Sequence, residues 1–155
     1  MKNNYLKFYN NLVKLTRNKV LYENFNDKDE FSDRLIFLLI HLSFFFKAFK
    51  TKENNNLLQE IYDFVFRQLE LSIREIGYGD QSINKKMKVY VNLLHSMITE
   101  IHFWENLTKT EKLKKFSLFL SDFNKIDHLL DYFELFDENL SKKTLNSYLK
   151  SVSNP

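Results

Sequence analysis

The sequence contains no cysteine, only two glycines, and a single proline, which is its last residue. Without cysteine the chain can form no disulfide and offers no thiolate for catalysis, and most structural zinc sites are excluded as well. Glycine and proline make tight turns and interrupt helices, so their scarcity leaves little with which to build the turns of a β-protein. The composition therefore predicts an all-α fold.

The chain also lacks an apolar run long enough to cross a bilayer. The most apolar stretch, Leu35 to Phe46, is twelve residues long and contains His41 and Ser43, whereas a membrane-spanning helix needs roughly 20 residues. It can be a buried helix or a surface for a membrane or an apolar partner, and we interpret it as a buried helix. No secretory signal is evident at the N-terminus.

Most of the chain carries apolar residues at steps of three and four, the spacing of one face of an α-helix. In the segment from about Asp33 to Lys50, apolar residues occupy nearly the whole circumference, which predicts a helix in the middle of a bundle. The whole pattern predicts helices over residues 5–18, 33–50, 57–76, 83–104, 113–133 and 145–149.

Polar stretches are predicted to separate these helices. Asp29, Ser32 or Asp33 can cap the second helix. The predicted connectors and turns are Asn24–Glu30, Thr51–Asn56, Glu105–Thr110 and Asp137–Ser141, and periodicity leaves open whether Ser121–Asn124 interrupts a helix. We predict that residues 1–155 form one domain, a bundle of about five to seven helices around a central αα-hairpin.

The two glycines lie between the two segments that form this hairpin. Gly77 is suited to the left-handed residue that ends a helix, because it has no Cβ to clash there. Asp80 or Ser82 can cap the next helix by accepting backbone N–H bonds, and Arg74 can pair with Asp80 to hold the two helices together. The structural interpretation is a capped interhelical turn; the functional one is a polar corner on which a partner docks.

Charge is unevenly distributed although the net charge is only +3. Residues 81–115 carry seven lysines against three acids, while residues 116–155 carry four lysines against six acids. Lys85, Lys86 and Lys88 concentrate the basic charge at the start of one predicted helix, where cations oppose the helix dipole. They are either solvated lysines near Glu75 and Asp80 or part of a binding surface.

No residue pattern indicates catalysis or a metal site. His95 and His102 share a side of one helix, but no HExxH motif or phosphate-binding glycine loop is present. A single His41 in an apolar run is typical of a buried, hydrogen-bonded histidine rather than a ligand. We therefore expect neither an enzyme nor a cofactor, a metal or a small-molecule substrate.

The glycine-containing segment resembles a known family. Arg74-Glu75-Ile76-Gly77-Tyr78-Gly79-Asp80, followed by Ile83, Lys85, Lys86, Met87 and Lys88, is similar to the RExGxGD and lysine-rich block of the ubiquinol-cytochrome c chaperones, which assist assembly of the cytochrome bc1 complex. Further similarity extends over roughly Leu12 to Met97 and is carried by Leu12, Val13, Arg17, Tyr22, Asp33, Arg34 and the Leu39–Leu42 step containing His41.

The resemblance implies an all-α chaperone that binds newly made cytochrome b or a bc1 assembly intermediate. It also implies a second chaperone subunit, the ribosome and peripheral membrane contact as partners. The location would be cytoplasmic, at the inner face of the bacterial membrane, or the matrix side in a mitochondrion. A helical nucleic-acid-binding, ribosome-binding or general protein-interaction module is the alternative. The expected partner contacts are Arg34, His41, Arg74, Glu75, Gly77, Tyr78, Gly79, Asp80, Lys85, Lys86, Met87 and Lys88.

Overall fold

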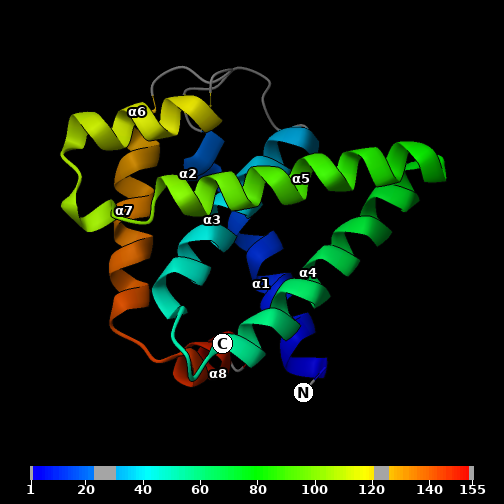
Figure 1. Ribbon diagram of the computed structural model, residues 1–155, viewed down its shortest axis with the longest axis horizontal. Coiled ribbons are helices and arrows are strands. Elements are labelled where there is room, and N and C mark those ends of the chain that lie inside the picture. The colour runs from blue at the N-terminus through cyan, green and yellow to red at the C-terminus, as the bar shows by residue number, and fades with distance from the viewer. Residues whose placement is uncertain (1, 23–30, 121–125, 154–155) are drawn as a thin grey trace.

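The computed structural model describes residues 2–22, 31–120 and 126–153. These residues form a helical bundle without a β-strand (Figure 1), which confirms the predicted all-α fold. Seven of the α-helices in this part of the chain have nine residues or more. The elements are α1 (Lys2–Thr16), α2 (Lys19–Tyr22), α3 (Phe31–Phe49), α4 (Asn55–Ile76), α5 (Asp80–Glu100), the 3-10 turn η1 (Trp104–Asn106), α6 (Lys109–Phe119), α7 (Asp127–Ser141) and α8 (Leu145–Ser153).

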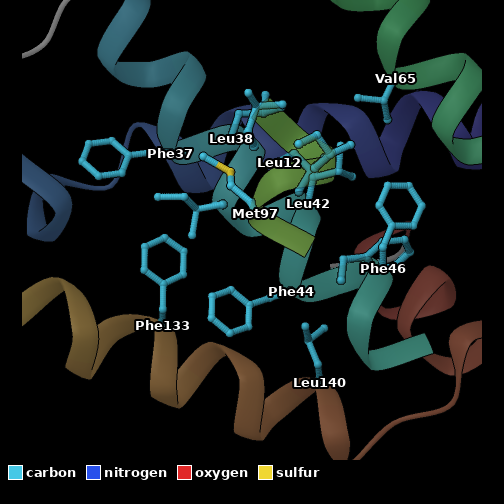
Figure 2. Close-up of a cluster of buried hydrophobic side chains, with 14 of the residues drawn as sticks. Leu12, Phe37, Leu38, Leu42, Phe44, Phe46, Val65, Met97, Phe133 and Leu140 are labelled. Carbon is cyan, nitrogen blue, oxygen red and sulfur yellow. The ribbon is translucent and has the colours of Figure 1, made fainter. Parts of the chain in front are cut away.

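Helix α3 lies at the centre of the bundle, as its all-round apolar pattern predicts. It contacts α1, α5 and α7, and every residue from Phe37 through Phe46 is buried. Figure 2 shows side chains of α3 among those of α1, α5 and α7, with Leu12, Met97 and Phe133 around them. Burying a large apolar side chain stabilises a fold by about 1.5–3 kcal/mol, so this helix supplies much of the driving force for folding.

Aromatic rings join the helices on the α7 side of the core. Phe44 of α3 stacks on Phe133 of α7 at a centroid distance of 5.7 Å and meets the edge of Trp104 at 5.2 Å. Trp104 in turn stacks on Phe116 of α6 at 5.3 Å. Stacked and edge-to-face pairs add to the free energy of area burial, so four elements are held by one cluster of rings.

His41 is the main polar group inside this core. It is fully buried, its Nδ1 lies 2.7 Å from the Phe37 carbonyl oxygen, and its Nε2 lies 2.8 Å from the Tyr132 hydroxyl. Since a carbonyl only accepts, Nδ1 must carry the proton and Nε2 accepts from Tyr132. Burial lowers the pKa of His41 to about 4. The prediction of a buried, hydrogen-bonded histidine is confirmed.

The predicted turn at Asp137–Ser141 is wrong. Helix α7 continues through Ser141, and the turn follows it before α8 begins at Leu145. Asp137 reads as a turn residue in sequence, but Lys47 of α3 pairs with it at 3.3 Å and with Glu105. Helical periodicity therefore could not show that Asp137 lies within a helix, because the lysine that pairs with its carboxylate belongs to another helix.

Two other predicted boundaries shift. Helix α3 begins at Phe31, so Ser32 and Asp33 lie inside its first turn instead of capping it; Asp29 lies outside the described residues, as does the Ser121–Asn124 stretch. The predicted connector Glu105–Thr110 overlaps the end of η1 and the start of α6, and Thr108 and Glu111 form a capping box at the N-terminus of α6.

Helices α4 and α5 form the predicted αα-hairpin. In Figure 1 they diverge from a turn at one end of the molecule's long axis, while α7 lies at the other end. Their far ends pack onto the core through residues such as Leu58, Leu94 and Met97. Among the described residues no helix is both long and apolar enough to span a membrane.

Candidate functional site at the turn between α4 and α5

The joint, which we define as residues Arg74 to Lys88, has a turn fixed by its two glycines. Gly77 ends α4 in the left-handed region, with φ 107° and ψ 14°, and its N–H donates to the Arg74 carbonyl at 3.0 Å. Gly79 has extended backbone with φ −74° and is the N-cap of α5, and its carbonyl accepts from Ile83 at 2.9 Å. The predicted left-handed role of Gly77 is confirmed.

The predicted side-chain cap by Asp80 or Ser82 is wrong. Helix α5 begins at Asp80, three residues earlier than apolar periodicity indicates, and its N-cap position belongs to Gly79, which makes no side-chain bond. Asp80 is instead the acidic residue of the first turn, where a negative charge is favourable to the helix dipole. Its carboxylate turns to Arg74.

Arg74 ties the two helices together, as predicted. Its guanidinium contacts the Asp80 carboxylate at 2.5 Å and the Glu70 carboxylate at 3.3 Å. The hydrogen bond to Asp80, followed by that to Glu70, raises the pKa of Arg74. All three groups are well exposed, so solvent screens these pairs and they stabilise the fold little. They do present a fixed guanidinium beside carboxylates at the surface.

The three lysines of the joint lie beyond the first turn of α5. Because the helix starts at Asp80, Lys85 and Lys86 fall in the second turn and Lys88 in the third. The helix-dipole penalty predicted for them is therefore small, since the effect fades within one turn. Lys86 places its ammonium 4.5 Å from the centroid of the Tyr78 ring, a cation–π contact that fixes both side chains.

The structure brings ten of the predicted contact residues together in the joint. Of these, Lys86 and Met87 are half-buried and Met87 packs against the core, while the other eight are exposed. Arg34 lies near the start of α3 rather than in the joint, and is half-buried. His41 is fully buried in the bundle, so the prediction that it offers a surface contact to a partner is corrected: its ring packs inside the core.

Two buried isoleucines flank the turn of the joint. Ile73 and Ile83 are fully buried on either side of the turn but do not belong to the continuous core cluster around α3. On the outer side, Val89 is 58% exposed and Tyr78 is 44% exposed. Sequence reasoning missed Val89. The sequence does contain a signal for its exposure, because Val89 is apolar yet falls outside the helical stripe formed by Ile83, Met87 and Leu94.

The two histidines considered as metal ligands have other surroundings. His95 Nε2 lies 3.3 Å from the Tyr62 hydroxyl, which joins α5 to α4, and the His102 ring meets the edge of Phe103 at 4.5 Å. In the part of the chain that the structure describes, no group of three or more metal-ligating side chains is present.

The arrangement defines an all-α protein that displays a fixed polar turn at one end. Comparison with protein families matches the ubiquinol-cytochrome C chaperones over residues 23–102, more than half of the chain and including the whole joint. The chain belongs to the ubiquinol-cytochrome C chaperone family. Membership supports a non-enzymatic chaperone role in assembly of the bc1 complex. The similarity seen at Leu12 to Tyr22 lies outside the matched range.

Comparison with curated proteins and with solved structures finds no significant match.

Proposed function

We propose that the protein binds newly made cytochrome b during bc1 assembly and that the joint is its contact surface. The observation that carries the proposal is that the family-matched segment places Arg74, Glu75, Tyr78 and Asp80 together on an exposed turn. Exposed side chains of this kind add little to the stability of the fold. Contact with another molecule would account for their grouping on this turn.

The phenylalanines of the described residues supply little surface for a client. Among the described residues, Phe103 is the phenylalanine that is strongly exposed, at 64%, and most of the others lie in the core cluster. We therefore infer contact with a polar loop or helix end of cytochrome b. Guanidinium, ammonium and carboxylate groups at the joint can pair with charged side chains there.

The proposed setting follows from the same family role. A client inserted in a membrane requires a chaperone that works at the membrane surface, at the inner face in a bacterium or the matrix side in a mitochondrion. A second chaperone subunit and the ribosome are further proposed partners. A single polar corner is small for a stable interface, which usually buries about 800 Å² per partner, so additional subunits would complete it.

Cross-linking in cells tests where the client binds. A photoreactive amino acid at Tyr78 should capture cytochrome b. The matched control carries the same group at Phe103, which is also aromatic and exposed but lies next to η1, and it should capture none. Capture of cytochrome b equally from both positions, or from neither, would contradict the proposed contact surface.

Substitution of the joint tests whether it is required. Arg74→Ala with Asp80→Ala should lower the level of assembled bc1 complex while the melting temperature stays unchanged, because the ion pair is exposed. Glu100→Ala with Lys115→Ala removes a partly buried ion pair outside the joint and should leave assembly normal. Normal bc1 assembly in the Arg74/Asp80 variant would count against the proposal.

A further inference from the structure

We propose that the outer side of the first three turns of α5 is a docking surface for an anionic lipid bilayer. This lysine face consists of Tyr78, Ser82, Lys85, Lys86, Lys88, Val89 and Tyr90. The inference rests on the proposed membrane setting and names the surface that would meet the lipid, and it does not depend on the binding of cytochrome b.

The lysine face itself contains three lysines and no acidic side chain. From Gln81 through Thr99, α5 contains three lysines and no aspartate or glutamate. Ion pairs are formed by Lys47, Arg74, Lys112 and Lys115, and none of these pairs uses a lysine of this face. Of the acids nearest along the chain, Asp80 pairs with Arg74, and Glu75 is an exposed residue at the end of α4. Anionic headgroups would supply counter-charge for these lysines.

The same face carries apolar surface. Ser82, Lys85, Lys86, Val89 and Tyr90 line a shallow depression of about 320 Å³, and Tyr78 lies against Lys86 at its edge. Lysine stems and tyrosine rings favour the boundary between water and hydrocarbon, where their apolar parts are buried while the polar tips stay hydrated. Exposed valine beside them can enter the outer part of the acyl region.

The charge at the opposite end of the molecule would orient the protein on the bilayer. Helices α6 and α7 together carry four lysines against six acids, and α7 has five acids with no lysine or arginine. In Figure 1 α7 lies at the far end of the long axis from the joint. An anionic surface would attract the lysine face and repel α7. The protein would therefore contact the bilayer through the turn between α4 and α5, with α7 pointing away from it.

The chemistry favours a bilayer over a nucleic acid. Three cations beside exposed valine and tyrosine match a headgroup boundary, whereas phosphate-backbone binding rests on a larger number of cations tracking the strand. Each lysine near an anionic membrane contributes about 1 kcal/mol, so three of them correspond to roughly a hundredfold in partition. The contact would be reversible and sensitive to salt.

Vesicle sedimentation of the full chain tests the proposal. Vesicles of phosphatidylcholine with added phosphatidylglycerol should bind the protein at low salt, and pure phosphatidylcholine vesicles should bind it far more weakly. Lys85→Gln, Lys86→Gln and Lys88→Gln together should weaken partition about a hundredfold. The matched control, Lys109→Gln, Lys114→Gln and Lys142→Gln, removes the same charge from exposed positions outside α5 and should keep most of the binding.

A fluorescence probe tests the orientation separately. The native tryptophan, Trp104, is buried, so a new tryptophan at the surface reports its own surroundings. Tyr78→Trp should shift its emission to the blue when anionic vesicles are added, because the ring leaves water. Phe103→Trp, at an exposed position next to η1, should show no shift.

Three outcomes would overturn the proposal. The first is no binding of the unaltered protein to anionic vesicles at low salt. The second is equal loss of binding in the two triple variants. The third is salt-dependent binding to single-stranded RNA that the α5 lysines alone control, without vesicle binding, which would assign the face to nucleic acid. Because the vesicles contain no cytochrome b, each of these results leaves the proposed client contact untouched, and loss of that contact leaves vesicle binding intact.

Discussion

The core around α3 and the joint between α4 and α5 use the same kinds of side chain for opposite purposes. In the core, His41 and Tyr132 hydrogen-bond to each other among phenylalanine rings. In the joint, Tyr78 and Lys86 meet at the surface, and Arg74 pairs with carboxylates that solvent reaches. Polar contacts in the core are shielded from water, whereas those of the joint are screened by it.

This difference shows where stability and binding reside. Side chains of the core are close-packed, so removing one leaves a cavity or an unpaired polar group. Side chains of the joint can change with little effect on the free energy of unfolding, and they are therefore free to meet the needs of a partner. The backbone of the turn is the exception, because Gly77 holds a conformation that other residues adopt at a cost.

The largest expected effect comes from the aromatic cluster. Phe133→Ala should lower the free energy of unfolding by about 3–5 kcal/mol, since the ring is fully buried against Phe44, Phe116 and His41. Phe103→Ala, at an exposed position, should change it by less than about 0.5 kcal/mol. Urea unfolding followed by circular dichroism measures both. Similar losses in the two variants would remove the contrast between core and surface.

A smaller effect is expected from the protonation of His41. Its pKa is about 4 in the folded protein, below the ordinary value of 6.5, because burial penalises the charged ring. The unfolded chain therefore binds a proton first as the pH falls. The stability contributed by neutral His41 is complete above pH 6.5 and declines toward pH 4, by roughly 3 kcal/mol in total.

Other groups also titrate in this range, so the measurement is a difference between two proteins. His41→Phe keeps an aromatic ring but loses the hydrogen bond to Tyr132, and it should be less stable than the unaltered protein at neutral pH. The gap should narrow as the pH falls from about 6.5 to 4, because the variant has no ring to protonate. A gap that stays constant would mean that His41 takes up its proton equally in both states.

Helices and their centre follow from the sequence because they rest on local periodicity. The apolar circumference of residues 37–46 predicts their burial, and two glycines locate the hairpin turn. Features that depend on distant residues do not follow. Asp137 reads as part of a turn until Lys47, ninety positions away, pairs with it. The sequence predicts that His41 is buried and hydrogen-bonded, but its partner Tyr132 is ninety-one positions away, so the spacing could not identify that partner.

The sequence predicts which residues gather in the joint, but not how the turn between its helices is built. Ten of the twelve predicted contacts lie in the joint, and Arg34 and His41 lie elsewhere. Apolar periodicity marks where a helix becomes buried, whereas the backbone of α5 begins earlier, at Asp80. That shift accounts for the wrong cap and for the overestimated dipole penalty on the lysines. The capping box at Thr108 and Glu111 was visible in the sequence as T-x-x-E.

The smallest of these effects isolates the backbone of the joint. A Cβ added at Gly77 or at Gly79 would meet no atom within 4 Å, so packing does not separate the two positions. Gly77 alone has a positive φ, of 107°, and Gly77→Ser should therefore lower the free energy of unfolding by about 1 kcal/mol. Gly79→Ser, at an extended N-cap position, should be neutral or stabilising by a few tenths of a kcal/mol. Thermal unfolding of the two variants compares them directly, and equal melting temperatures would show that the left-handed turn is not what holds the hairpin in shape.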